Sequence, residues 1–226
     1  MSAQDYGAAF KAWRTAAPDW DAYTHHAFVQ GVGNGTLPRS AFLHYLVQDY
    51  VFLVHFSRAW ALGVVKAETL DEMKTCAATV DGLVNHEMQL HVRTCAEAGI
   101  DETALFKATE EQANLAYTRY VLDAGFSGDF LDLMAALAPC VMGYGEIGAR
   151  LKIEATSDAY RPWIETYAGD DYQQVCRNVG QMIDDALRRR VADDFQASPR
   201  WDALTERFAT ATRLEVGFWG MGLAGA

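Results

Sequence analysis

Apolar residues recur along this chain at intervals of three and four positions, which is the spacing that places them on one face of an α-helix. No segment alternates apolar and polar residues between turn residues, as a half-buried strand would. The sequence therefore predicts an all-α fold, a single-domain multi-helix bundle over residues 1–226. The expected helices span residues 4–16, 19–30, 38–66, 70–98, 110–124, 128–154, 159–168, 171–193 and 199–220.

Capping residues indicate where several of these helices begin and end. Thr69 followed by Glu72 is typical of a capping box, and Gly99 is expected to end the helix that starts there. Because glycine interrupts helices, we also expect stops at two further positions and one loop. These are Gly125, Gly169 and the segment from Gly31 to Leu37.

Polar side chains interrupt three of the apolar stripes near their centres. Asp49 interrupts the stripe of helix 38–66, and Glu215 interrupts that of helix 199–220. In helix 128–154 the central positions are Cys140 and Tyr144. A buried carboxylate without a partner is costly, so both acids must be paired, hold a proton, or line a polar cavity. Hydrogen bonds between packed helices and a functional cavity both remain open as explanations.

Cys140 lies in a segment that is unusual for a helix. Pro139 precedes it and lacks a backbone donor, and Gly143, Gly145 and Gly148 follow. Each glycine costs about 1 kcal/mol relative to alanine in a helix interior, so three together indicate close approach by another helix or by a ligand. The remaining cysteines are interpreted as small buried apolar residues. They are Cys76, Cys95 and Cys176.

Composition and charge narrow the class of protein. With 226 residues, half of them apolar, the chain can bury one sizeable core. The formal net charge of −11 is spread along the chain, which disfavours nucleic acid as a partner. The longest uncharged apolar run, from Leu133 to Gly145, has 13 residues where a membrane helix needs about 20. With no signal-peptide pattern and four scattered cysteines, we expect a cytoplasmic protein without a membrane segment.

Two further helices carry pairs of aromatic residues on one face. Tyr117 and Tyr120 share a face of helix 110–124, and Trp163 and Tyr167 share a face of helix 159–168. Such pairs are typical of a packed core. They are equally suited to stack on a flat heteroaromatic ligand while a phenol hydroxyl binds its nitrogens.

Taken in order, these segments resemble the TenA family, also called thiaminase II or aminopyrimidine aminohydrolase. The resemblance runs from Trp20 to Trp219 and depends on the order and spacing of short segments. These are His26 to Phe28 before the glycine-rich segment, Gln48-Asp49-Tyr50, Pro139-Cys140 with Tyr144, Tyr160 to Tyr167, and Glu215 with Phe218 and Trp219. The resemblance implies a heme-oxygenase-like helical fold, a small pyrimidine as substrate, no cofactor, and a homo-oligomer, specifically a tetramer.

The resemblance also implies roles for individual residues. Cys140 matches the family's nucleophile, and Asp49 and Glu215 match the two carboxylates that hold and protonate the pyrimidine. The substrate-binding residues are expected to be Phe52, Tyr117, Tyr144, Tyr167 and Phe218. Phe52 is a departure, because many members have a tyrosine there. One hydroxyl hydrogen bond to the ligand is therefore lost, which leaves the preferred substrate open.

A mechanism follows from these roles. The thiol of Cys140 adds to a ring carbon while Glu215 protonates a ring nitrogen, and the adduct expels the amine and accepts water. The expected substrates are 4-amino-5-aminomethyl-2-methylpyrimidine and thiamin, with 4-amino-5-hydroxymethyl-2-methylpyrimidine as product. Asp49 would hold the 4-amino group or steer protons.

Three other readings compete with this one. Glu87 and His91, four positions apart on a helix, could ligate a metal in an oxidase of the same fold. His25 or His26 could ligate heme. A pyrimidine-binding or regulatory protein without turnover is the third alternative, and release of ammonia from the aminopyrimidine would distinguish it from the enzyme.

Overall fold

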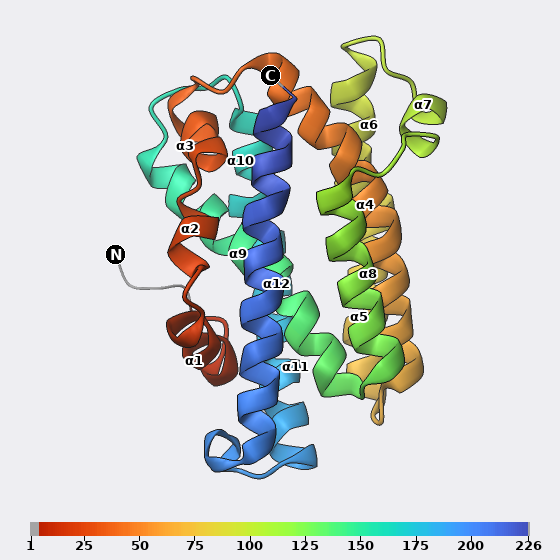
Figure 1. The fold of residues 1–226 in the computed structure, drawn as a ribbon, viewed down its shortest axis with the longest axis vertical. Coiled ribbons are helices and arrows are strands. Elements are labelled where there is room, and N and C mark those ends of the chain that lie inside the picture. The colour runs from red at the N-terminus through yellow and green to blue at the C-terminus, as the bar shows by residue number, and fades with distance from the viewer. Residues whose placement is uncertain (1–4, 226) are drawn as a thin grey trace.

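A computed structural model describes residues 5–225, and these residues form α-helices joined by short connections (Figure 1). No strand occurs between residues 5 and 225, which confirms the all-α prediction. The first six helices are α1 (Ala8–Ala16), α2 (Trp20–Thr24), α3 (Ala27–Asn34), α4 (Arg39–Lys66), α5 (Leu70–Gly82) and α6 (Met88–Ala96), with a π-helical turn at Leu83–Glu87. The others are α7 (Glu102–Phe106), α8 (Gln112–Ser127), α9 (Phe130–Glu154), α10 (Arg161–Ala168), α11 (Asp170–Arg190) and α12 (Pro199–Ala224), with a 3₁₀ turn at Phe195–Ala197.

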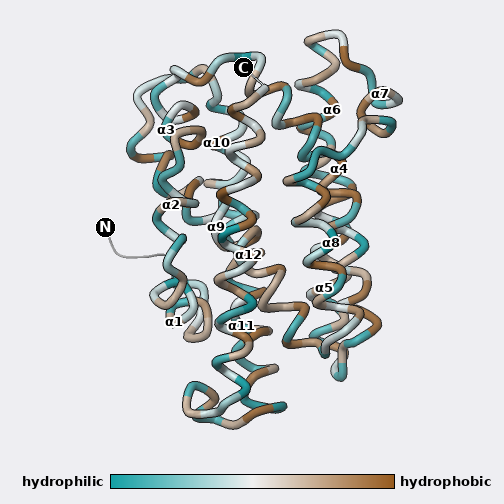
Figure 2. Tube along the Cα trace, viewed as in Figure 1, coloured by the Kyte–Doolittle hydropathy of each residue, from teal (hydrophilic) through white to brown (hydrophobic). Residues whose placement is uncertain are grey.

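Helix α9 lies at the centre of the bundle. It packs against α8, α10, α11 and α12, while α4 packs against α5, α6, α8 and α12. In Figure 1, α12 runs vertically in front of α9, with α4, α5 and α8 to one side and α1 to α3 to the other. Figure 2 shows hydrophobic and hydrophilic residues interspersed along the helices, as expected where each helix buries one face.

The apolar length of α9 reflects its central position. The helix as a whole is long and apolar enough to cross a membrane, although its longest run without a charged residue is shorter than a membrane span. Its most apolar stretch is entirely buried inside the bundle. Glu146, one of its few charged residues, accepts two hydrogen bonds from the guanidinium of Arg14, at 2.6 and 2.7 Å. The helix is thus covered by other helices, and its buried Glu146 is paired with Arg14.

The glycines of α9 permit close packing of neighbouring segments. A Cβ atom on Gly143 would lie 2.2 Å from the ring of Tyr23, and one on Gly148 would lie 2.5 Å from the carbonyl carbon of Tyr167. Of the two explanations offered by the sequence, close approach by another part of the chain therefore holds at both positions. At Gly148 the contact is with backbone, so this glycine fixes how closely α10 approaches α9.

Several predicted helices are interrupted in the structure. The helix predicted at 19–30 ends at Thr24, because His26 caps the start of α3 by accepting a hydrogen bond from the amide of Phe28. The helix predicted at 70–98 begins with the expected capping box at Thr69 but is divided by the π-helical turn Leu83–Glu87. Short α7 was not predicted.

Two glycine-based predictions were wrong. The expected loop from Gly31 to Leu37 is helical as far as Asn34. Gly125 lies inside α8, where a Cβ atom would come within 2.6 Å of the side chain of Leu62. In both cases the glycine serves close packing and does not end the helix. The positive φ angle that ends a helix occurs at Gly35 and, as expected, at Gly99.

Helix α1 begins at Ala8, later than predicted, and Asp184 of α11 caps it from a distance. The two carboxylate oxygens of Asp184 accept hydrogen bonds from the amides of Ala8 and Ala9, both at 2.8 Å. Position 4 of the predicted helix lies outside the described residues. The preceding residue, Gly7, has a φ of 109° and no side chain to cap the helix. The buried carboxylate therefore ties the N-terminal helix to the bundle.

Replacing Asp184 by alanine is expected to lower the free energy of unfolding by about 2 kcal/mol, because two helix N-terminal amides lose a charged acceptor. Urea unfolding followed by circular dichroism measures this. The control is Asp185→Ala at the exposed neighbouring position, for which we expect a change within about 0.5 kcal/mol. Equal effects of the two substitutions would show that Asp184 does not anchor α1.

Candidate active site

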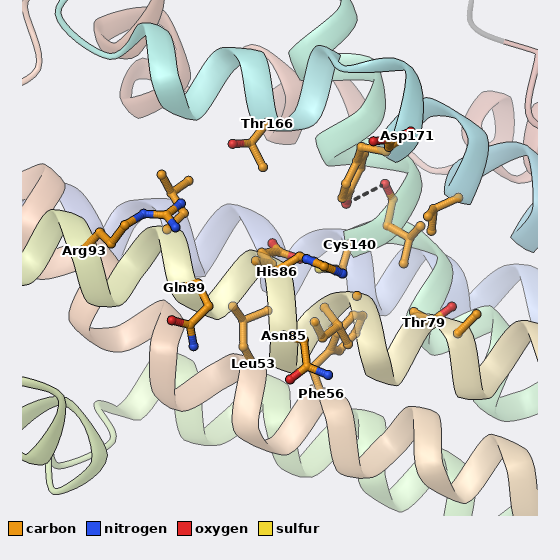
Figure 3. A pocket seen from close by; sticks show the side chains of 18 residues that line it. Leu53, Phe56, Thr79, Asn85, His86, Gln89, Arg93, Cys140, Thr166 and Asp171 are labelled. Carbon is orange, nitrogen blue, oxygen red and sulfur yellow. Dashed lines mark hydrogen bonds between the residues drawn. The ribbon is translucent and has the colours of Figure 1, made fainter.

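Cys140 lies midway along α9 and borders a cavity of about 520 Å³. This volume is within the roughly 300–1,000 Å³ that is common for small-molecule sites. Figure 3 shows Cys140 near the centre of the lining residues, with Gln89 and Arg93 of α6 along one wall and Thr166 of α10 on the opposite side. The π-helical turn Leu83–Glu87 completes the first wall. Cys140 is thus a buried thiol with access to a ligand-sized space.

Glu215 of α12 is the acid most closely associated with Cys140. Its side chain is 1% exposed, and its Oε1 atom accepts a hydrogen bond from the hydroxyl of Tyr117 at 2.8 Å. Burial raises the pKa of Glu215 to about 8, and the charge of Asp49 acts in the same direction, while hydrogen bonds from Tyr117 and Cys140 lower it. Glu215 is therefore mainly protonated at neutral pH.

The environment of Cys140 disfavours a free thiolate. Burial raises the pKa of its thiol well above the ordinary value, and the nearby charges of Glu215, Glu87 and Asp49 raise it further. A negative charge on sulfur would therefore be repelled by acids on three sides. A nucleophilic role for this sulfur would therefore require transfer of its proton.

Asp49 of α4 is held by two hydrogen bonds to the same oxygen. Its Oδ2 atom accepts from the hydroxyl of Tyr45 at 2.9 Å and lies 2.7 Å from Nε2 of His91. Among residues 5–225, Oδ1 has no hydrogen-bond partner. One side of this carboxylate is therefore fixed, and the other remains able to accept a hydrogen bond from a ligand.

His91 of α6 pairs with Asp49 in surroundings that favour its charged form. Its Nδ1 atom lies 3.0 Å from the main-chain oxygen of Glu87, and because a carbonyl only accepts, Nδ1 must carry a proton. Burial disfavours the imidazolium, but the hydrogen bond and charge of Asp49, together with Glu87, outweigh it and raise the pKa of His91. With both nitrogens protonated, Nε2 donates to Asp49.

Aromatic side chains surround these acids. The ring of Phe52 lies 5.0 Å from that of Tyr117 and 5.3 Å from that of Phe218, measured between centroids. The ring of Tyr144 lies 4.8 Å from that of Tyr167. Edge and tilted contacts of this kind restrict ring rotation, so the polar atoms between the rings keep their positions.

The structure brings the predicted residues into one network, but not all of them face the cavity. Of the predicted set, only Cys140 lines it. Asp49, Glu215 and the five predicted aromatic residues are buried in the interior around it. Of the three predicted catalytic residues, only Cys140 therefore borders this cavity, while Asp49 and Glu215 are buried.

Sequence reasoning assigned no role in the network to Tyr45 and considered Glu87 and His91 only as metal ligands. A signal was present for all three. Tyr45 and Asp49 are four residues apart, as are Glu87 and His91, so each pair shares a helix face. Pairing these two faces across α4 and α6 would have indicated the Asp49–His91 contact.

The metal and heme readings gain no support from these side chains. Both nitrogens of His91 are occupied, and residues 5–225 contain no group of three or more side chains placed to hold a metal ion. His26 caps α3, and Nδ1 of His25 lies 3.1 Å from the hydroxyl of Thr24. Neither residue lines the cavity.

Comparison with known proteins places this chain in a family. Residues 13–225 match the model of the TENA/THI-4/PQQC family. An uncharacterized protein of Haemophilus influenzae is 40% identical over 92% of this chain and 95% of its own length. An aminopyrimidine aminohydrolase of Halalkalibacterium halodurans is 36% identical over 92% of both chains.

Solved structures agree with this assignment. A crystal structure described as a TenA family transcription regulator, from Silicibacter sp. TM1040, superposes with a TM-score of 0.96 at 62% identity, covering 98% of this chain and 99% of that one. A domain from Shewanella denitrificans with a heme oxygenase-like fold has a TM-score of 0.70 at 12% identity, over 94% of this chain and 90% of that one, and so shares the fold alone. The predicted heme-oxygenase-like fold is confirmed, and the chain belongs to the TENA/THI-4/PQQC family.

Proposed function

We propose that this protein is a hydrolase that converts 4-amino-5-aminomethyl-2-methylpyrimidine into its 5-hydroxymethyl counterpart and ammonia, as a step of thiamin salvage. The observation that carries the proposal is the thiol of Cys140 at a ligand-sized cavity, next to the protonated acid Glu215. The name of the Halalkalibacterium halodurans relative supports this substrate class. The four cysteines are free and buried, which fits a cytoplasmic location.

The chemistry needs both groups. An electron-rich aminopyrimidine expels its exocyclic amine only after a nucleophile has added to the ring, and protonation of a ring nitrogen makes that addition possible. Glu215 holds the required proton at neutral pH, and Cys140 supplies the nucleophile. Because the thiol is itself protonated at rest, its proton passes to Glu215 as the carbon–sulfur bond forms and Glu215 gives its own proton to the ring nitrogen. No cofactor is needed in this scheme.

Asp49 and the aromatic residues would hold the ring in place. The free Oδ1 atom of Asp49 is suited to accept a hydrogen bond from the 4-amino group, and Phe52 and Phe218 offer ring faces for stacking. Phe52 cannot supply the hydroxyl that many family members have at this position. We therefore keep thiamin as an alternative substrate, and measured kcat/KM values rank it against the aminomethylpyrimidine.

A regulatory role is the second candidate, because the Silicibacter relative is described as a transcription regulator. The net charge of −11 disfavours direct binding of DNA by this chain. Incubating the purified protein with 4-amino-5-aminomethyl-2-methylpyrimidine and measuring ammonia separates the two candidates. A catalytic protein releases it continuously, whereas a regulatory or binding protein that lacks turnover does not.

Replacing Cys140 by serine is expected to lower kcat for ammonia release on the order of 10⁴-fold or more, because the nucleophile is lost. Pyrimidine binding measured by calorimetry should change little, since the hydroxyl is no larger than the thiol. Cys95→Ser serves as control, because Cys95 is also buried but does not line the cavity. Near-normal turnover by Cys140→Ser would rule out covalent catalysis by this residue.

Glu215→Gln should reduce kcat by roughly 10²–10⁴-fold, the usual contribution of a general acid, with the fold preserved. In the unaltered protein, the pKa of about 8 means that the acid form predominates below pH 8 and is lost above it. We therefore expect kcat to fall as pH rises through about 8, measured as ammonia release at saturating substrate. A rate that keeps rising beyond that pH would contradict the acid role of Glu215.

His91→Gln is expected to destabilise the protein by about 3 kcal/mol near pH 6, because Asp49 is left buried without its cation. Folding raises the pKa of His91. The contribution of its charged form to the free energy of unfolding is therefore complete below about pH 6.5 and is lost as pH rises through the folded-state pKa. Urea unfolding at pH 6 and pH 9 should show the difference shrinking at the higher pH. The control is the exposed pair of His25 with Asp21. His25→Gln should change the free energy of unfolding by less than about 0.5 kcal/mol at either pH. A difference that grows with pH would contradict the cationic state of His91.

A further inference from the structure

Glu87 is a second acid at the cavity that the mechanism above does not use. It is the last residue of the π-helical turn Leu83–Glu87 between α5 and α6, and it lines the same cavity as Cys140. A π-helical turn adds a residue to the helix and changes which way the following side chains point, and such turns are frequent at functional sites. This turn is where the helix predicted as continuous is interrupted.

The carboxyl group of Glu87 is fixed on one side and free on the other. Its Oε1 atom accepts a hydrogen bond from the hydroxyl of Tyr167 at 2.7 Å, and its main-chain oxygen accepts from Nδ1 of His91 at 3.0 Å. Within residues 5–225, no hydrogen bond or ion pair reaches Oε2. A positioned carboxylate oxygen is therefore left for a ligand in the cavity.

The charges around the cavity favour a cationic ligand at its inner end. Asp49 and Glu87 supply two carboxyl groups near Cys140 besides the protonated Glu215, whereas His91 is the one cation that shifts the pKa of Glu87. Burial raises the pKa of Glu87 to about 7, and the charge of Asp49 adds to this effect. Arg93 also lines the cavity but is solvent-exposed, and Figure 3 shows it at the end of the cavity away from Cys140.

We infer that Glu87 binds the cationic aminomethyl group of the substrate and then accepts the proton of the water that replaces the amine. This inference rests on the proposed function and assigns the residue that holds the leaving group. An alkyl amine is an ammonium ion at neutral pH, so it needs an anionic partner on the cavity side of the ring. Two acids line the cavity, but only Glu87 is among the acids whose charge raises the pKa of Cys140, whereas Asp171 is solvent-exposed.

The reaction balances with Glu87 in this role. Cys140 first adds to the ring, and Glu215 takes the thiol proton as it gives its own proton to the ring nitrogen. The carbon–nitrogen bond then breaks and its electron pair leaves with neutral ammonia. Water then forms the carbon–oxygen bond at the exocyclic carbon, and Glu87 takes one proton from it. The carbon–sulfur bond breaks, the ring proton returns to Glu215 while Glu215 gives a proton back to the sulfur of Cys140, and Glu87 passes its proton to ammonia. The net change is substrate ammonium plus water to alcohol plus ammonium ion.

The test compares two ligands that differ only in the charge of the side group. Binding is measured by calorimetry on Cys140→Ser, which cannot turn over, with 4-amino-5-aminomethyl-2-methylpyrimidine and its neutral 5-hydroxymethyl analogue. Adding Glu87→Gln should weaken binding of the cationic ligand roughly 10- to 100-fold, as expected for loss of a charged hydrogen bond. Binding of the neutral ligand should change less than about 2-fold, because its hydroxymethyl group carries no charge that Glu87 could balance. Glu97→Gln, at an exposed position just beyond α6, is the matched control and should affect neither ligand.

Each outcome decides the inference. Selective loss of the cationic ligand supports it. Equal weakening of both ligands would overturn it and would show a structural role for Glu87, while the proposed function stands because the Cys140→Ser parent binds both pyrimidines. Binding of neither ligand by the parent would overturn this inference together with the proposed function.

Discussion

Acids buried beside a thiol have to be neutralised inside an apolar helical bundle, and the surroundings of Cys140 follow from that requirement. The two most deeply buried acids meet it differently. Asp49 pairs with the cation His91, whereas Glu215 keeps its proton because burial raises its pKa to about 8. One buried acid therefore has a basic partner, and the other keeps its proton. This division provides a hydrogen-bond acceptor and a proton donor within one site.

The fold holds these groups in place with elements that are far apart in sequence. Asp49 comes from α4, His91 from α6, Cys140 from α9 and Glu215 from α12, so no local segment contains the site. Close packing at Gly148 brings α10, and with it Tyr167, against α9. Because each helix is fixed by packing along its whole length, small displacements of these side chains are costly. The site is rigid for the same reason that the bundle is stable.

Helical periodicity was enough to predict the fold class and to single out Asp49, Cys140 and Glu215, because each is a polar residue in an otherwise apolar stripe. The role of Glu87 could not be predicted in this way. Its direction depends on the π-helical turn, which leaves no trace in a pattern read with a 3.6-residue period. The loop predicted from Gly31 and the helix stop predicted at Gly125 were wrong for a related reason. In a sequence, a glycine that permits close packing cannot be distinguished from a glycine that ends a helix. The expected homotetramer and the roles of the aromatic residues stay predictions.

The central physical claim is that Glu215 carries a proton at neutral pH next to Cys140. Infrared spectroscopy tests it without a substrate, because a protonated carboxyl group absorbs separately from a carboxylate. The difference spectrum between the unaltered protein and Glu215→Gln at pH 7 should contain a protonated carboxyl band that disappears as pH rises through about 8. A difference spectrum with only the carboxylate bands of Glu215 at pH 7 would contradict the account.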